Sequence, residues 1–201
     1  DANITSQNYI APDGSSWSLS KATFRFDSDF YLGPNLDKVI LEGVNAISIS
    51  SEGNVSIGKS LSGAVQFADS VAHLPGGTLL DGHDAHYGDD PLKGLRVGRG
   101  QMGGFSGSQG PGKGASLGSS GASGVSGGGG SFAGEGGPGA SGPSGITYGS
   151  GSLNVLIGGS GGGMGNLGEA AAGGGAIEIL AEGDLIIQSG VKISMNGGSV
   201  F

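Results

Sequence analysis

The feature that most constrains this chain is a glycine at every third position from Gly118 to Gly151, broken only by Ala133 and Tyr148. An α-helix repeats about every 3.6 residues and a β-strand every two, so neither predicts this spacing. A left-handed polyproline-II-type helix turns once in about three residues, and the repeat therefore gives it one edge without side chains. We expect such an edge to let a neighbouring backbone approach closely.

Shorter runs with the same step flank this tract. They are Gly104, Gly107 and Gly110 before it, and Gly159, Gly162, Gly165, Gly168 and Gly174 after it, with Ala171 as the one substitute. We therefore predict three glycine-rich passes that pack side by side as polyglycine-II helices. Backbone amides would bond between neighbouring passes, because buried amides need partners.

Two simpler interpretations compete with this bundle. Gly/Ser-rich sequence is usually a flexible linker, but a linker needs no fixed period and has no use for apolar residues such as Phe105 and Ile157. Collagen also needs glycine at every third position, yet only three prolines lie between residues 98 and 175. A triple helix so poor in proline would be unstable.

The composition argues against several classes of partner. Of 201 residues 48 are glycine, only 13% are charged, and the net charge is −8. The nine Lys and Arg form no run, which argues against nucleic acid and anionic membrane. Cysteine is absent, so the fold relies on no disulfide or thiolate metal site. No stretch of about 18 apolar residues occurs, and we expect neither a signal peptide nor a membrane span in this sequence.

An internal duplication is the second decisive feature. Residues 46–57 recur 130 positions later as residues 176–187, with a Glu-Gly turn in each copy. Apolar residues match on one alternating face: Ile47 and Ile177, Ile49 and Ile179, Val55 and Leu185, Ile57 and Ile187. Each copy is expected to be strand, turn, strand. We expect the copies to stack as rungs of a short β-solenoid resembling a parallel β-helix; two hairpins facing each other in a β-sandwich are the alternative.

These patterns predict a mainly β chain with almost no α-helix, divided into four parts. Residues 1–38 form an aromatic-containing cap, in which the alternation over residues 22–26 suits a half-buried strand. Residues 39–97 hold the first β repeat and an acidic loop, residues 98–175 the polyglycine-II-like region, and residues 176–201 the second β repeat, which reads as truncated. The glycine-rich region is then an insertion whose two ends lie close together in space.

The acidic loop is the densest polar constellation in the chain. It contains Asp81, His83, Asp84, His86, Asp89 and Asp90. Two imidazoles with aspartates would suit zinc or another transition metal, and aspartates along a glycine-containing loop would suit calcium. The spacing matches neither an EF-hand nor a zincin, and a solvated acidic turn is the simpler interpretation. A divalent cation here would fix the crossover from β to glycine-rich structure.

Catalytic motifs are not found. No serine sits in a Gly-x-Ser-x-Gly elbow between a strand and a helix, and at this glycine content phosphate-loop patterns arise by chance. We therefore expect no catalysis and no cofactor other than the cation considered for the acidic loop. A carboxylate set of Asp84, Asp89 and Asp90 keeps a polysaccharide-active β-helix enzyme as the least favoured alternative.

The C-terminal third carries a more specific pattern. It has a Gly-Gly-Ser-Gly-Gly block at residues 158–162, paired β segments at 176–187 and an Asn-Gly-Gly ending at 196–198. Over residues 39–198 the chain resembles a class of secreted glycine-rich surface proteins of bacteria and protists. The resemblance implies an extracellular, structural or adhesive setting, and it transfers no catalytic residues.

We therefore predict a noncatalytic extracellular structural protein, a module of a surface fibre, sheath or matrix that self-assembles through its β ends into a filament or layer. Neither nucleic acid nor membrane insertion is expected. The alternative is an adhesin in which Trp17, Tyr87 and Tyr148 recognise a glycan or another cell surface. Ice binding is a remote further alternative, since no regular threonine array is visible.

Overall fold

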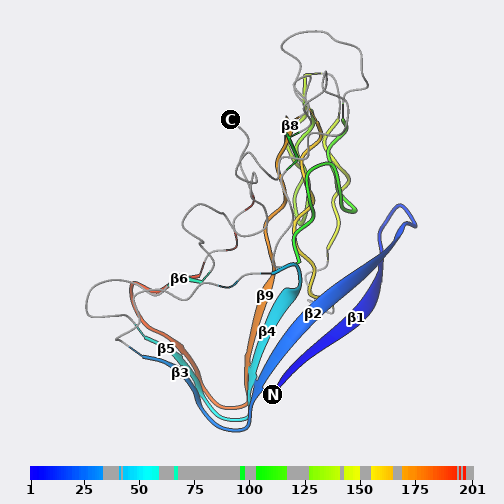
Figure 1. The fold of residues 1–201 in the computed structure, drawn as a ribbon. Helices are drawn as coiled ribbons and strands as arrows, with labels where there is room; N and C mark the ends of the chain where they lie inside the picture. The colour runs from blue at the N-terminus through cyan, green and yellow to red at the C-terminus, as the bar shows by residue number, and fades with distance from the viewer. Residues whose placement is uncertain are drawn as a thin grey trace.

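The computed structural model is mainly β, and the residues that it describes contain no helix (Figure 1). The described residues are 1–33, 41, 43–58, 66–67, 96–97, 103–116, 127–140, 143–149, 155–164, 169–193, 195 and 197. Within them there is accordingly no helix long and apolar enough to cross a membrane. The expectation of a mainly β chain is confirmed.

The N-terminal segment forms a long antiparallel hairpin of β1 (Ala2–Ile10) and β2 (Ser16–Phe26). Asp13 sets the turn, since its Oδ1 accepts hydrogen bonds from the Oγ and the amide N of Ser15 at 2.7 and 2.9 Å. These bonds, that of the hydroxyl first, lower the pKa of the Asp13 carboxyl. Gly14 follows with a φ of 83°, a conformation that glycine adopts without strain. The strand expected over residues 22–26 is confirmed as the end of β2, but its burial does not alternate, since Phe24 and Arg25 are both exposed.

The two copies of the duplication lie side by side as parallel strands. They supply β4 (Ala46–Ser51), β5 (Val55–Ile57), β9 (Ile177–Ala181) and β10 (Leu185–Ile187). β4 pairs with β9 and β5 with β10, and both registers align each residue with its counterpart in the other copy. The predicted stacking of the copies is confirmed. The β-sandwich of facing hairpins is wrong, because the two strands of each copy belong to different sheets.

A third unit of the same kind lies at the N-terminal side. β2 and β3 (Phe30–Leu32) pair in parallel with β4 and β5. One sheet therefore has the order β1-β2-β4-β9 and the other β10-β5-β3. Three strand–turn–strand units are stacked: the first unit (residues 16–32), the second unit (residues 46–57) and the third unit (residues 177–187). Their turns lie together at the bottom of Figure 1.

The main core belongs to the second unit, which has a neighbour on each side. Its buried side chains, each at most 5% exposed, are Ile47, Ile49, Val55 and Ile57. Phe26 and Phe30 of the first unit pack against them with their ring centroids 4.5 Å apart, and Ile179 of the third unit closes the other side. Burial of one such aliphatic side chain contributes about 1.5–3 kcal/mol, so the middle of the stack is its most stable part.

The glycine-rich region begins and ends beside β4. The amide N of Gly103 donates to the carbonyl O of Val44 at 2.9 Å, and the amide N of Ile47 donates to the carbonyl O of Ala176 at 3.1 Å. The two ends of the insertion are therefore close together, as predicted. Two short parallel pairs complete the strands: β6 (Gln66–Phe67) with β11 (Lys192–Ile193), and β7 (Arg96–Val97) with β8 (Glu169–Ala170).

Within this region the backbone forms extended threads that are bonded to one another with almost no β-ladder. The described threads are the first (residues 103–116), second (127–140), third (143–149), fourth (155–164) and fifth (171–175). The second thread folds back on itself, since the amide N of Gly129 donates to the carbonyl O of Gly137 at 2.7 Å. Figure 1 shows them running together as a bundle above the four-stranded sheet. The predicted number of three passes is wrong, because the chain turns back within the middle tract and because the fourth and fifth threads run antiparallel, with Gly159 bonded to Gly174 and Gly162 to Ala171.

Hydrogen bonds of the fourth thread change partner with a period of three. The amides of Gly158 and Gly161 donate to carbonyls of the first thread at 3.2 and 3.0 Å. Those of Gly159 and Gly162 donate to the fifth thread at 2.7 and 2.9 Å, and that of Gly163 to the second thread at 2.7 Å. A β-strand directs its amides alternately to two neighbours. The fourth thread instead bonds to neighbours on three sides.

Several glycines of the middle tract lie directly against neighbouring backbone. A Cβ would lie within 2.5 Å of a backbone oxygen at each of Gly127, Gly130, Gly136 and Gly145. Gly134 and Gly137 are out of phase with these residues, and a Cβ there would meet nothing within 4 Å. Close backbone approach at the in-phase glycines agrees with the predicted bare edge, but a Cβ on out-of-phase Gly128 would also overlap the carbonyl O of Pro143, so contact is not restricted to one phase.

The prediction that Gly159 and Gly162 form the close-contact edge of the fourth thread is wrong. A Cβ on Gly159 or Gly162 would be 3.1 or 3.7 Å from the nearest atom. On Gly158 it would be 2.6 Å from the carbonyl O of Gly103, and on Gly161 closer still to that of Ser106. This thread is surrounded by others, so more than one of its edges must lack side chains.

Candidate functional site

A ladder of Asp and Asn side chains joins the turns of the three units. Asp29, Asn54 and Asp184 occupy the same place in each unit, directly before its second strand. The Oδ1 of Asp29 accepts a hydrogen bond from the amide N of Asn54 at 2.7 Å. The Oδ1 of Asn54 accepts one from the amide N of Asp184 at 2.8 Å. Each side chain thus holds the backbone of the next unit in register.

Glycine precedes Asn54 and Asp184 in the sequence. At each of these glycines, the ladder side chain of the preceding unit lies against the backbone and leaves no room for a side chain. A Cβ on Gly183 would be 2.5 Å from the Oδ1 of Asn54, and one on Gly53 would be closer still to the Oδ1 of Asp29. Ser28 takes this place in the first unit, beneath which no further unit lies among the described residues. Glycine followed by Asp or Asn therefore marks a unit that is seated on another.

A buried serine reinforces the same turn. The Oγ of Ser51 donates to the carbonyl O of Ser28 at 2.6 Å and accepts from the amide N of Gly53 at 3.2 Å. Ser51 is only 1% exposed, and its hydroxyl satisfies backbone groups that would be costly to bury unpaired. Neither this serine nor the ladder was expected from the sequence, although the shared Glu-Gly-Asx turn of the two copies is the signal for the ladder.

Charged side chains also connect neighbouring units. Glu178 of the third unit accepts a hydrogen bond from the Oγ of Ser48 at 2.6 Å and lies 3.5 Å from the Nζ of Lys21. Arg25 and Glu52 pair at 2.5 Å, and the hydrogen bond and charge of Glu52 raise the pKa of the Arg25 guanidinium. Solvent screens such partly exposed pairs and they contribute little to stability, so their main effect is on register.

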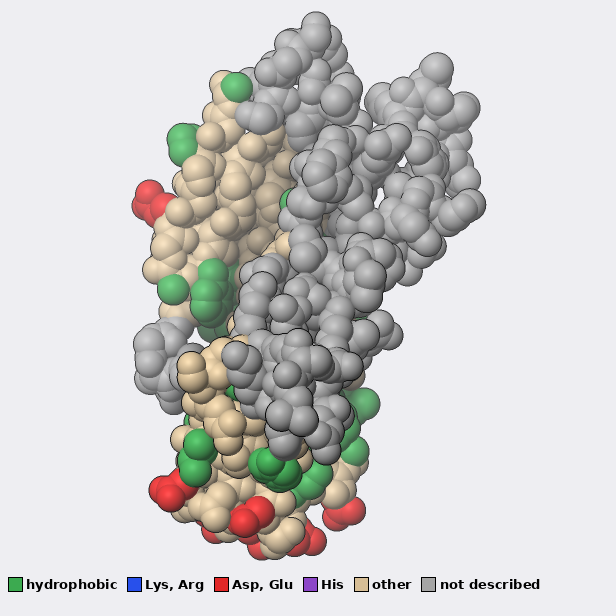
Figure 2. Space-filling view, turned by 90° about the vertical axis from the view of Figure 1, so that its left-hand side faces the viewer, with side chains coloured by type: hydrophobic (Ala, Val, Ile, Leu, Met, Phe, Trp, Pro, Cys, Tyr) green, Lys and Arg blue, Asp and Glu red, His purple; other side chains and the backbone are tan. Residues whose placement is uncertain are grey.

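The third unit leaves an open edge, which consists of the free side of β9 and β10 together with Asp184. In both sheets these strands are terminal, as far as the described strands go. Leu185 and Ile187 are 46% and 47% exposed, whereas the residues aligned with them in the second unit are completely buried. Figure 2 shows acidic side chains gathered at the lower end, where the turns lie, with hydrophobic side chains beside them.

Tyr148 joins the hairpin to the glycine-rich bundle. It is 1% exposed, and its hydroxyl donates to the carbonyl O of Gly158 at 2.6 Å. The rings of Phe132 and Tyr9 lie 5.2 and 6.2 Å from its own. Burial raises the pKa of its phenol above the ordinary value. The alternative in which Tyr148 recognises a glycan is therefore contradicted, because its side chain is almost completely buried.

Trp17 belongs to the same junction. Its ring meets that of Phe105 edge to face at 5.2 Å, and its Nε1 donates to the Oγ of Ser15 at 2.8 Å. These contacts give it a packing role between hairpin and bundle. Tyr87, the third aromatic residue considered for glycan binding, lies outside the described residues.

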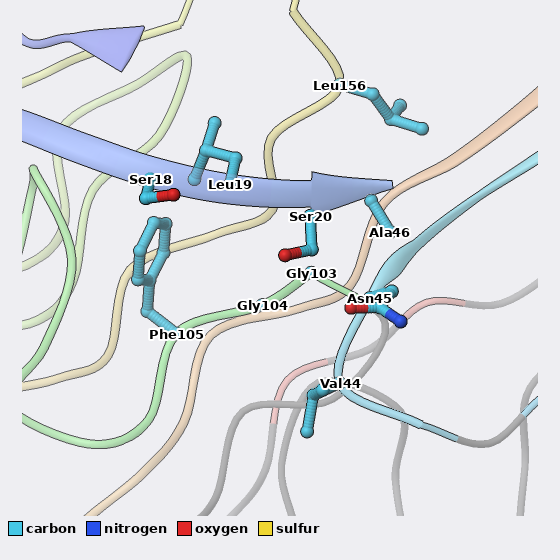
Figure 3. Close-up of a pocket in the computed structure, with 10 residues that line it drawn as sticks. All are labelled: Ser18, Leu19, Ser20, Val44, Asn45, Ala46, Gly103, Gly104, Phe105 and Leu156. Atoms are coloured by element: carbon cyan, nitrogen blue, oxygen red, sulfur yellow. The ribbon is translucent and has the colours of Figure 1, made fainter. Parts of the chain in front are cut away.

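A pocket of about 150 Å³ lies where β2, the start of β4 and the first thread meet (Figure 3). Leu19, Phe105 and Leu156 form its apolar walls, and Ser18 and Ser20 contribute hydroxyls. No ionisable side chain lines it. Ligand pockets usually have volumes of about 300–1,000 Å³, so this hollow is better explained as a packing gap at the junction.

The predicted metal ligands are outside the part of the chain that the structure describes. They are Asp81, His83, Asp84, His86, Asp89 and Asp90. Among the residues that are described, no group of three or more His, Asp or Glu side chains is placed to hold a metal ion. The cation at the acidic loop, and the carboxylate set within it, stay predictions.

Comparison with known proteins finds no protein-family model, no curated protein and no solved structure that matches this chain.

Proposed function

We propose that this chain is a noncatalytic structural module of an extracellular fibre, sheath or matrix, in which a short β-solenoid carries a polyglycine-II bundle. One observation carries the proposal: the successive amides of Gly161, Gly162 and Gly163 donate to three different threads, at 3.0, 2.9 and 2.7 Å. A helix with about three residues per turn points successive amides in three directions. Polyglycine-II packing accounts for this pattern, and pairing within one sheet does not.

Such packing would make the bundle stiff. Its threads are held by backbone-to-backbone bonds, and at the in-phase glycines no side chain separates them. Each bond contributes only about 0.5–1.5 kcal/mol net, but a thread can leave only by breaking bonds to several neighbours at once. A protease, which needs an extended segment free of partners, would find none in the fourth thread.

The strand arrangement supports the solenoid part of the proposal. The second unit leads to β6 and the third to β11, and these strands pair in parallel just as the units themselves do. Parallel pairing in the same chain order therefore recurs in three places. The Asp and Asn ladder adds the register that repeated rungs require.

An extracellular setting is proposed from the resemblance to secreted glycine-rich surface proteins. The residues that support it are the block at 158–162 and the ending at 196–198. The fourth thread contains that block, so its glycine spacing serves the bundle described above.

Association of copies is also part of the proposal, and β1 is the edge that supports it. Asp1 and Arg25 exchange both of their backbone hydrogen bonds, at 2.9 and 2.8 Å. Alternation in antiparallel pairs then turns the amides of even-numbered β1 residues outward. β1 contains no charged residue, glycine or proline, and Ile4 and Ile10 are 65% and 63% exposed. An edge of this kind is a template for antiparallel pairing with β1 of a second copy.

Two substitutions at Ser6 test this association. Ser6→Pro removes an outward amide without touching the bonds to β2, whereas Ser6→Ala keeps the amide. In sedimentation velocity and negative-stain imaging over a concentration series, the parent chain and Ser6→Ala should assemble and Ser6→Pro should stay monomeric. Assembly by none of the three would overturn self-association. Unprotected amides over residues 155–164 in hydrogen exchange would overturn the bundle.

A further inference from the structure

We propose that the open edge accepts a strand–turn–strand segment of another polypeptide, and that this segment must carry glycine immediately before an Asp or Asn in its turn. The inference rests on the proposed solenoid and specifies what extends it. Addition of strands to a free sheet edge is a common mode of peptide recognition, in which backbone bonds give affinity and side-chain fit gives specificity.

Polarity of the ladder supplies the first argument. The Oδ1 atoms of Asp29 and Asn54 each accept a hydrogen bond from a backbone amide of the following unit, at 2.7 and 2.8 Å. Asp184 stands at the same place in the third unit, and no donor among the described residues reaches its carboxylate. A carboxylate accepts such a bond more strongly than an amide oxygen does. The acceptor for a further unit is therefore already in position.

Apolar surface at the open edge supplies the second argument. Val55 and Ile57 are completely buried because the third unit covers them, whereas Leu185 and Ile187 at the aligned positions are 46% and 47% exposed. A unit seated on β10 in the same register would cover these two side chains in the same way. The interface it would form continues the one already present between β5 and β10.

The requirement for glycine follows from the two interfaces within the chain. Both Gly53 and Gly183 lie against the ladder side chain of the preceding unit, where a Cβ would overlap its Oδ1. A segment seated on the third unit would meet Asp184 in the same way. Alanine at that position would push the turn away from Asp184 and break the register.

An intact second copy does not meet these conditions. Its first unit has Ser28 where glycine is needed, and β1 occupies the edge of β2 that would have to pair with β9. Two open edges placed face to face would run antiparallel, which loses the ladder, and they would bring Glu182 and Asp184 of both copies together. The occupant is therefore a segment of a different polypeptide.

A labelled peptide with the sequence of residues 46–58 is a direct probe, with its Gly53→Ala version as the matched control. Fluorescence anisotropy against the full chain, at concentrations where sedimentation shows a monomer, should give saturable binding. The control peptide should bind at least tenfold more weakly. Asp184→Ala in the protein should weaken binding of the parent peptide about tenfold, as expected for a lost bond to a charged acceptor. Asp184→Asn should retain most of the binding, because Asn54 performs the same role.

Several results would overturn the proposal. Equal binding of the glycine and alanine peptides, or no binding by either up to millimolar concentration, would do so. Loss of binding in Asp184→Asn as well as Asp184→Ala would remove the ladder from the explanation. Assembly of the parent chain that Asp184→Ala abolishes and Ser6→Pro does not would assign the open edge to a second copy. Failure of the chain to assemble by itself bears only on the proposed self-association and leaves these measurements intact.

Discussion

Replacing Gly114 by alanine should loosen the bundle, because the added methyl group has no space. Its Cβ would overlap the carbonyl O of Gly128 and lie 2.8 Å from the amide N of Gly163. It would thus meet the backbone of the second and fourth threads at once. Carbon atoms pack at about 3.5–4.0 Å from such neighbours, so the first thread would have to move by about 1.5 Å.

The expected cost follows from the hydrogen bonds that such a movement breaks. Gly114 donates to the fourth thread at 3.3 Å, and Ala115 donates to Pro143 at 3.2 Å and accepts from Gly128 at 3.0 Å. At about 0.5–1.5 kcal/mol each, loss of these three bonds costs about 3 kcal/mol. Alanine also restricts the unfolded chain more than glycine does, and this offsets about 0.4–1 kcal/mol of the cost. The free energy of unfolding should fall by about 2–3 kcal/mol, or roughly 4–12 °C in Tm for a chain of this size.

Gly137→Ala is the matched control, since a Cβ there meets nothing within 4 Å. Its stability should equal that of the parent chain or exceed it slightly. Urea unfolding followed through the fluorescence of Trp17 is a suitable assay, because this single tryptophan packs against Phe105 of the first thread. Equal unfolding midpoints for Gly114→Ala and Gly137→Ala would refute the close backbone packing.

Two further predictions concern the ladder and the junction. Asn54→Ala removes the acceptor for the amide of Asp184 and the side-chain donor to Asp29, and it should lower the free energy of unfolding by about 1–3 kcal/mol in urea titration. Exposed Asn8→Ala should change it little, and an equal effect would contradict the ladder. Tyr148→Phe leaves the carbonyl O of Gly158 without its hydroxyl donor and should cost about 1–2 kcal/mol. Because burial raises the pKa of Tyr148, the folded chain holds this proton more tightly than the unfolded chain. The stability contributed by the group is complete below pH about 10 and lost as pH rises above it; an identical alkaline decline in Tyr148→Phe would contradict this.

Glycine spacing predicted some of the close contacts of the middle tract but not those of the fourth thread. Gly127, Gly130, Gly136 and Gly145 touch neighbouring backbone as their phase predicts, although they meet three different segments and out-of-phase Gly128 makes a similar contact. The fourth thread is surrounded, so its contacts depend on how many threads reach it. That number is a property of the whole bundle and is not encoded in the local period.

The duplication predicted which strands pair, since the two copies share the same apolar alternation and only one register aligns their apolar residues with one another. The first unit escaped notice for a physical reason. Its turn reads Asp-Ser-Asp at residues 27–29 where the copies have Glu-Gly-Asn or Glu-Gly-Asp. The first unit has no further unit below its turn among the described residues and so has no need of glycine there, and its strands have Phe24 and Phe30 opposite Ile49 and Val55 of the second unit.

Aromatic residues in the glycine-rich region correctly indicated a packed structure. Their roles could not be assigned, because sequence does not show which face of a ring is covered. Tyr148 is buried by Phe132 and Tyr9, and these contacts join positions far apart in the chain. Assigning such a ring to packing or to ligand binding requires the fold.

The measurement that tests the central claim most directly is detection by NMR of scalar couplings across hydrogen bonds. The amides of Gly161, Gly162 and Gly163 should couple to the carbonyl carbons of Gln109, Ala171 and Gly128 respectively. Three consecutive amides joined to three separate threads would establish the bundle. Couplings that alternate between two threads, or no couplings at all, would contradict it.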